Sequence, residues 1–202
     1  MKGKFIVFEG IDGAGLSTQA LLLESRLRKS GYKVVLTKEP TNGLIGGLIK
    51  ACLKNEWKTS LTALQILFAA DRAHHLSYEI IPSLKKGKIV ICDRYILSTI
   101  AYGMIELERE WLEALNSKFL KPDITFLIDI PVEVSLKRIK AARFGAEIFE
   151  KRRQLEKVRK NYLKLISSAK NSFVIDGTKP IEEVHEDIIK IVKGVLRLKV
   201  RD

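Results

Sequence analysis

The stretch that decides the fold reads Gly10-Ile11-Asp12-Gly13-Ala14-Gly15-Leu16-Ser17-Thr18, which has the spacing of a phosphate-binding loop. An apolar run over 5–8 precedes it and a helical leucine pattern over 20–27 follows it, which is the strand–loop–helix context that such a loop needs. Its glycines let successive backbone N–H groups point at one anion, and the following helix adds the positive end of its dipole. Leu16 stands where the pattern G-x-x-x-x-G-K-[ST] expects a lysine. The stretch therefore predicts binding of nucleoside phosphates without the point charge that normally reaches their outer oxygens.

The chain length of 202 residues predicts one domain over 1–202, with room for a substantial core and a small lid. Hydrophobic residues make up 46% of the chain and charged residues 30%, as in ordinary globular proteins. No apolar run approaches the roughly 20 residues that cross a bilayer, and the first predicted strand begins too early to leave room for a signal peptide. Cys52 and Cys92 are too few for a disulfide framework or a metal site. We therefore expect a cytoplasmic protein with no membrane partner, and few Asn and Gln beside abundant Lys, Glu and Ile indicate a thermophile.

The net charge of +12 raises a nucleic-acid-binding alternative. Lys and Arg are spread along several predicted helices, and aromatic residues are not interleaved with them. We interpret the charge as a lysine-rich surface plus a basic pocket for anionic nucleotides, and expect no nucleic-acid partner. The alternative rests on charge alone and predicts steeply salt-dependent binding to DNA or RNA.

Strands and helices alternate along the chain. The five strand-like runs are nearly continuous in apolar residues, as expected for strands covered on both faces; they span 5–8, 34–37, 89–92, 124–130 and 172–175. Helical patterns lie between and after them, over 17–29, 44–53, 61–84, 96–119, 132–143, 147–169 and 181–198. This alternation predicts a three-layer α/β sandwich of the P-loop NTPase type, with a five-stranded parallel sheet and right-handed crossovers.

Charged and phosphate-seeking residues follow the predicted strands, where ligands of such sheets bind. Asp93 and Arg94 close the third strand: the carboxylate suits the water shell of Mg²⁺, and the guanidinium suits phosphate oxygens. Ser17 offers its hydroxyl to the same ion. Phe68 and Arg72 are four residues apart on one helix, so an aromatic plane and a planar donor share a face that suits a flat base. The pattern predicts a nucleotide site on this edge.

The chain resembles the thymidylate kinases of the P-loop nucleoside-monophosphate kinase group along essentially its whole length. The matching motifs, in order, are Phe8–Gly15, Thr37–Pro40, Phe68–His74, Asp93–Tyr95 with Ser98, Ala101 and Tyr102, Pro122–Asp129, Phe149-Glu150, Leu155–Tyr162 and Ile175–Thr178. The resemblance implies transfer of the ATP γ-phosphate to dTMP with Mg²⁺, in dTTP biosynthesis.

The resemblance also implies residue roles. Phe68 would stack on thymine, Arg72 would hydrogen-bond its edge, Ser98 would lie near the base, and Tyr102 would pack against the deoxyribose. Asp12 and Arg94 would face the transferred phosphate as catalytic residues. Further substrate contacts are implied for Lys38, Glu39 and Pro40, and Mg²⁺ contacts are implied for Glu9, Ser17 and Asp93. Contacts with ATP are implied for Gly10, Ile11, Asp12, Gly13, Ala14, Gly15, Leu16, Ser17, Thr18, Arg138, Asp176, Gly177 and Thr178.

Three positions depart from the family pattern. At position 16 a leucine replaces the loop lysine. At position 38 a lysine replaces an arginine, so a single ammonium charge stands where a guanidinium would offer two parallel N–H donors. Gly103 replaces a glutamine, and the loss of that polar group predicts relaxed base selectivity. The resemblance also implies a short helical lid around 138–150, in which similar family members place a catalytic arginine. Arg138, Lys140 and Arg143 are the candidates here, and Arg143 is the one we favour.

Two readings of the function follow. The first is an active dTMP kinase, with or without relaxed base selectivity, because the residues expected at the acceptor site occur together in the chain. The alternative is a catalytically impaired nucleotide-binding or regulatory paralogue on the kinase scaffold, motivated by Leu16. The resemblance further implies a homodimer built on helices, for which Leu97, Ile100 and Leu107 are candidates, although a core-facing helix would show the same apolar stripe.

Overall fold

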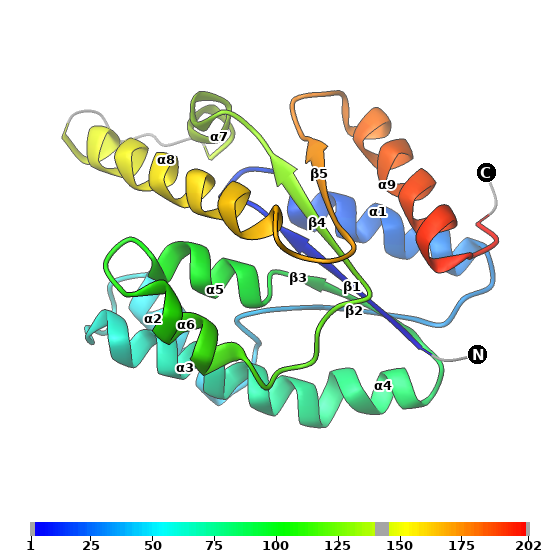
Figure 1. Ribbon diagram of the computed structural model, residues 1–202, viewed down its shortest axis with the longest axis horizontal. Helices are drawn as coiled ribbons and strands as arrows, with labels where there is room; N and C mark the ends of the chain where they lie inside the picture. The colour runs from blue at the N-terminus through cyan, green and yellow to red at the C-terminus, as the bar shows by residue number, and fades with distance from the viewer. Residues whose placement is uncertain (1–2, 140–145, 201–202) are drawn as a thin grey trace.

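The computed structural model describes residues 3–139 and 146–200, and over 146–150 only the backbone. Its centre is a five-stranded sheet in the order β2-β3-β1-β4-β5 (Figure 1). Every pair of neighbours is parallel, as predicted. The strands are β1 (Lys4–Glu9), β2 (Val34–Lys38), β3 (Ile89–Asp93), β4 (Ile124–Asp129) and β5 (Ser172–Asp176).

Helices cover both faces of the sheet (Figure 1). On one face α1 (Leu16–Lys29) packs beside α9 (Ile181–Leu196), and the Gln19 side chain joins them by donating to the carbonyl of Ile181. On the other face α4 (Ile81–Lys85) lies against β3, and α8 (Ala146–Ile166) lies against β4 and β5. The remaining helices are α2 (Leu44–Leu53), α3 (Leu61–His75), the π-helical turn η1 (Leu76–Ile80), α5 (Ile96–Gly103), α6 (Arg109–Asn116) and α7 (Val132–Arg138). The three-layer sandwich is confirmed.

Two long predicted helices are interrupted. The pattern over 61–84 contains the wider π-helical turn η1 before α4 begins. The pattern over 96–119 is divided into α5 and α6, because the chain turns after Gly103 and folds α6 back onto it. An added Cβ on Gly103 would lie 2.8 Å from Cδ2 of Leu112, so the missing side chain permits this close packing. The helix predicted over 132–143 ends at Arg138; residues 140–143 lie outside the described part of the chain.

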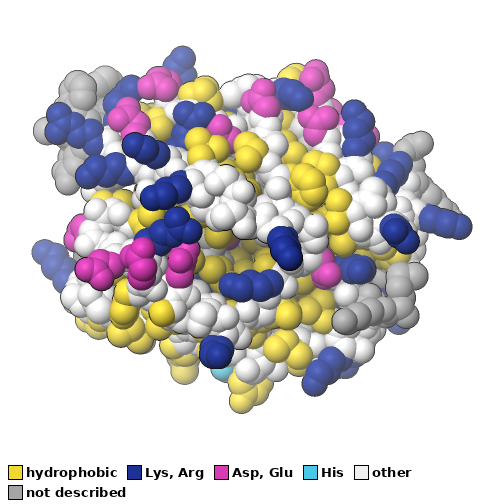
Figure 2. Space-filling model, viewed as in Figure 1, with side chains coloured by type: hydrophobic (Ala, Val, Ile, Leu, Met, Phe, Trp, Pro, Cys, Tyr) yellow, Lys and Arg dark blue, Asp and Glu magenta, His cyan; other side chains and the backbone are white. Residues whose placement is uncertain are grey.

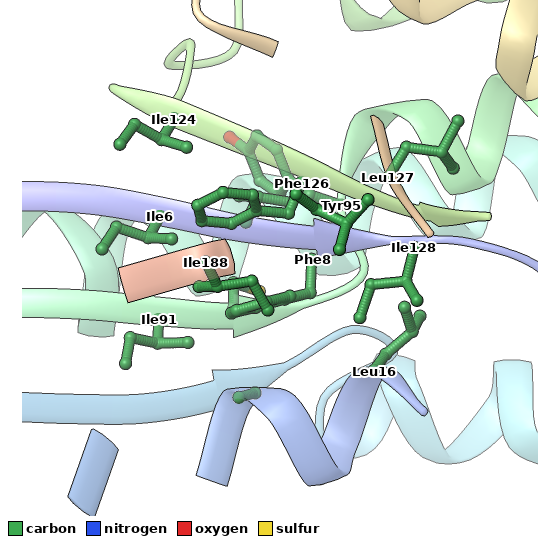
Figure 3. Packing of buried hydrophobic residues seen from close by; sticks show 14 of the residues in the cluster. Ile6, Phe8, Leu16, Ile91, Tyr95, Ile124, Phe126, Leu127, Ile128 and Ile188 are labelled. Carbon is green, nitrogen blue, oxygen red and sulfur yellow. The ribbon is translucent and has the colours of Figure 1, made fainter. Parts of the chain in front are cut away.

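The core is built on β1, whose residues Phe5–Phe8 are essentially inaccessible to solvent. Leu16 belongs to this core: its side chain is 5% exposed and lies beside Ile128 of β4 (Figure 3). An added Cβ on Gly10 would lie 3.2 Å from Leu16 Cδ2, so the side chain turns under the loop instead of along its outer surface. Leu16 therefore stabilises the loop by packing. None of the described helices is both long and apolar enough to pass through a bilayer.

Candidate active site

The loop between β1 and α1 has the geometry of an anion cradle. Gly13 and Gly15 have φ values of +76° and +96°, which glycine adopts without strain. The Ser135 hydroxyl of α7 donates to the carbonyl of Asp12 at 2.6 Å and fixes the loop from outside. The Ala14 N–H donates to the Ile11 carbonyl, and the first helical bond of α1 runs from the Gln19 N–H to the Gly15 carbonyl. The N–H groups of residues 15–18, between these two bonds, are therefore the ones available to a ligand. Residues 11–18, Asp93 and Arg94 line a cavity of about 290 Å³, the loop cavity.

A second cavity of about 510 Å³ adjoins the loop cavity and is mostly apolar; we call it the apolar cavity. The predicted substrate residues converge on its wall: Lys38, Glu39, Pro40, Phe68, Arg72, Arg94, Ser98 and Tyr102. They come from the ends of β2 and β3 and from helices α3 and α5, which the parallel sheet brings to one edge. The fold therefore brings these residues to one cavity wall, and their contacts with a substrate stay a prediction.

Arg94 lies at the junction and lines both cavities, as do Asp12 and Asp93. Its Nη1 donates to the carbonyl of Gly10 at 2.8 Å, and its Nη2 donates to Asp12 Oδ1 at 2.8 Å. Arg94 also has a φ of +69°, a conformation that costs a non-glycine residue about 1–2 kcal/mol. The guanidinium is thus held between the two cavities by backbone and carboxylate.

Arg72 is fully buried beneath the apolar cavity. Its Nε donates to Glu39 Oε2 at 2.9 Å and its Nη2 to Thr99 Oγ1 at 2.8 Å, while Nη1 donates to Asn116 Oδ1. Nη2 also lies 2.8 Å from Glu39 Oε2. These contacts orient the guanidinium and leave one of its five N–H donors, on Nη1, for a ligand in the cavity. Thr99 and Asn116 were not predicted.

His75 extends this network behind Glu39. Its Nδ1 lies 3.1 Å from Glu39 Oε1, and its Nε2 contacts Glu79 and Thr37. Burial alone would lower the pKa of His75, but the hydrogen bond and charge of Glu39, with a further contribution from Glu79, outweigh burial and raise it. The neighbouring carboxylates therefore shift the titration of His75 toward its charged form. It also borders a third cavity, of about 580 Å³, on the far side of Lys38.

Two of the three predicted magnesium residues are suitably placed. The Ser17 hydroxyl donates to Asp93 Oδ2, and both residues line the loop cavity. These hard oxygen donors beside a phosphate cradle suit a Mg²⁺ ion that also takes phosphate and water oxygens. Within the described ranges 3–139 and 146–200, no group of three or more His, Cys, Asp and Glu side chains is arranged to hold a metal ion by itself.

Glu9, the third predicted magnesium residue, is engaged elsewhere. Its carboxylate accepts from the backbone N–H groups of Tyr95 and Leu97 and from the Ser98 hydroxyl, so it holds the start of α5. Burial raises its pKa to about 7, against the hydrogen bond from Ser98 and the charge of Arg94. The structure therefore corrects this assignment: a buried carboxyl that caps a helix does not face the loop cavity, which Glu9 does not line.

The predicted ATP residues after β5 meet the loop through Arg138. Its Nη2 donates to the carbonyl of Gly177 at 3.0 Å, and its Nη1 approaches the carbonyl of Gly13 at 3.4 Å. Asp176 accepts from the N–H and the hydroxyl of Thr178, which closes the turn. Arg143 and Lys140, the other lid candidates, lie outside the described residues, as do all of residues 140–145 of the predicted lid.

Positively charged side chains are not confined to the surroundings of the site. Lys and Arg side chains are spread over the face shown in Figure 2 and do not form one block there. This distribution agrees with the interpretation of the net charge as a lysine-rich surface.

Comparison with known proteins gives a consistent result. A family model described as thymidylate kinase matches residues 8–188. A probable thymidylate kinase of Pyrococcus abyssi is 46% identical, over 97% of this chain and 98% of the relative. A thymidylate kinase of Thermosipho melanesiensis is 41% identical over 95% and 98%, and a probable thymidylate kinase of Sulfurisphaera tokodaii is 44% identical over 96% and 98%. The sources of these relatives fit the thermophile indicated by composition.

Proposed function

Because the chain belongs to the thymidylate kinase family and is therefore a nucleoside-monophosphate kinase, we propose that it transfers the γ-phosphoryl group of ATP to dTMP, forming dTDP and ADP. The observation that carries this proposal is the junction of the two cavities, where Arg94 and Asp12 line both. A donor phosphate in the loop cavity and an acceptor phosphate in the apolar cavity meet at these residues.

The acceptor lies with its thymine in the apolar cavity. Phe68 provides a face for the base, and the buried Arg72 presents an N–H donor to a carbonyl on its edge. Tyr102 lies between the base end and the phosphate end of the acceptor, where its hydroxyl donates to Asp12 Oδ1 at 3.3 Å. Burial raises the pKa of Tyr102 to about 12, so the phenol stays neutral beside the phosphate. The monophosphate then points toward Arg94.

The donor lies with its phosphates against the loop N–H groups and the start of α1. Arg138 and the 176–178 turn border the nucleoside end of this site. Ser17 and Asp93 would hold Mg²⁺ with the phosphates, and the ion neutralises charge on the donor when bound.

Transfer requires little covalent chemistry from the protein. A phosphate oxygen of dTMP attacks the γ-phosphorus in line, one P–O bond forms, and the bond to ADP breaks. The guanidinium of Arg94 is already oriented by the Gly10 carbonyl and Asp12, so it stabilises the transferred group without reorganisation. We propose that this fixed cation, with the lid residue Arg143, replaces the loop lysine that Leu16 lacks.

We also propose a homodimer and a cytoplasmic location, where ATP and dTMP are available. Ile100 is buried in the core, and Leu97 and Leu107 are partly buried and pack against it, so their contribution to a dimer surface stays a prediction. The packed pair α2 and α3 instead exposes large apolar side chains, with Leu44 93% exposed and Leu48, Leu53 and Ile66 about half exposed. Light scattering after gel filtration would show twice the monomer mass, and Leu48→Glu would return the monomer.

The experiment that tests the proposed function is direct detection of product. Purified protein with ATP and Mg²⁺ is given dTMP, dUMP or no acceptor, and nucleotides are separated by chromatography. We expect dTDP and ADP in equal amounts with dTMP. Folded protein that binds ATP but forms no dTDP would support the impaired-paralogue alternative instead.

A further inference from the structure

Gln65 is a buried amide on the wall of the apolar cavity. It precedes Phe68 by three residues and Arg72 by seven, so all three lie on one face of α3. The Gln65 side chain is 2% exposed, and its Oε1 has no hydrogen-bond partner in the part of the chain that the structure describes. An unmet buried acceptor is costly, and its position on a ligand cavity points to a ligand as the missing partner.

We propose that Gln65 accepts a hydrogen bond from the N3–H of the pyrimidine base, and so determines base selectivity. This inference rests on the proposed function, which places thymine in the apolar cavity. The edge of thymine presents one donor, N3–H, between two carbonyl acceptors. Arg72 has only donors, so it satisfies a carbonyl and cannot satisfy N3–H.

Two carboxylates on the cavity wall, those of Glu39 and Asp12, are already engaged. Glu39 accepts from Arg72 and contacts His75, and Asp12 accepts from Arg94. Gln65 Oε1 has none of these bonds, and a half-turn about the last side-chain torsion exchanges the positions of the amide oxygen and the amide nitrogen. Cytosine would meet Arg72 with an amino group and thus place donor against donor.

The space over Gly103 explains why Gln65 reaches this position. An added Cβ on Gly103 would lie 3.2 Å from Cδ of Gln65, so the two positions share one space. The relaxed base selectivity that the sequence predicts depends on the absence of an amide side chain at position 103. Gln65 provides an amide beside that position, and base selectivity is therefore retained.

The test compares dTMP with its difluorotoluene isostere, which keeps the shape of thymine but lacks N3–H and both carbonyls. Affinity is measured by calorimetry without ATP, and KM and kcat are measured with ATP. We expect Gln65→Leu to raise the dissociation constant and KM for dTMP about tenfold, with kcat changed less than about threefold. Its preference for dTMP over the isostere should fall by the same factor, because Arg72 still recognises a carbonyl.

Gln19→Leu is the matched control. Gln19 is also a buried glutamine with an unpartnered Oε1, but it lies between α1 and α9 and does not line the apolar cavity. This variant should keep the preference for dTMP within about twofold. If Gln65→Leu fails to fold, Gln65→Asn withdraws the amide by one methylene and should still reduce the preference.

Equal preference in the wild type, Gln65→Leu and Gln65→Asn would overturn the inference while leaving dTMP phosphorylation intact. Failure of the wild type to bind or phosphorylate dTMP would instead refute the proposed function. A preference that falls equally in Gln19→Leu would show a general packing effect and would also overturn the role of Gln65.

Discussion

Glu39→Gln removes the negative charge from an ion pair that is almost completely buried. The side chains of Glu39 and Arg72 are 3% and 1% exposed, and the closest charged atoms are 2.8 Å apart. Arg72 cannot lose its proton, so the substitution leaves a buried positive charge without its counter-charge. Breaking such a pair costs about 3–5 kcal/mol. We expect about 3 kcal/mol, because the glutamine oxygen and the Asn116 side chain still accept from the guanidinium.

Urea unfolding at neutral pH measures this loss as a lower midpoint with an unchanged slope. Glu24→Gln is the control: Glu24 pairs with Arg28 at 2.8 Å, but the Arg28 side chain is 54% exposed. The control should cost less than about 1 kcal/mol, since water screens an exposed pair. A loss below about 1 kcal/mol for Glu39→Gln, equal to the control, would refute the claim that this pair is a buried structural element of the base site.

Two further predictions concern Arg94 at the phosphate end and Glu9 at the start of α5. Arg94→Lys keeps the charge but loses the forked geometry, and should lower kcat/KM for dTMP about 10³-fold in steady-state assays; a loss below tenfold would contradict the central role of Arg94. Burial raises the pKa of Glu9 from 4.5 to about 7, so the folded state holds a proton that the unfolded state has released between these values. The protonated carboxyl of Glu9 therefore contributes about 3 kcal/mol to the free energy of unfolding. This contribution is complete below pH 4.5 and is lost as the pH rises through 7. Urea titrations from pH 5 to 8 should therefore show a steeper decline in stability for the wild type than for Glu9→Gln, and parallel curves would exclude this assignment.

The layers of the fold were predictable because the strands are short, nearly continuous apolar runs separated by longer helical patterns. The interruptions were not. Gly103 ends α5 through its close approach to Leu112, which depends on tertiary packing. η1 lies just before Pro82, whose missing N–H disrupts the helical ladder, but the hydrophobic pattern continues through it unchanged. Local periodicity cannot show either one.

The site divides in the same way. Phe68 and Arg72 were predictable from their spacing on one helix, and Arg94 from its place after a buried strand. Thr99 and Asn116, which hold Arg72, come from α5 and α6, and only the tertiary fold brings them together. The role of Leu16 depends in turn on where its side chain points, and the sequence shows only that the lysine is missing.

Glu9 shows a related limit. Its position at the end of β1 is what a metal-binding carboxylate would have, but strand residues alternate between faces. Its side chain turns to the N–H groups of α5 instead of the loop cavity. The position of Glu9 at the ligand-binding edge of the sheet was predictable, whereas the direction of its side chain depended on the fold.

The most direct test of the central claim is the rate of dTMP-dependent ADP release by the wild type and by Leu16→Lys, each confirmed as folded. The claim is that Arg94 and cations outside the loop make the loop lysine unnecessary. It predicts a wild-type kcat of about 1–100 s⁻¹ and a change of less than about tenfold on introducing lysine. Near-zero turnover in the wild type, restored by orders of magnitude in Leu16→Lys, would contradict it.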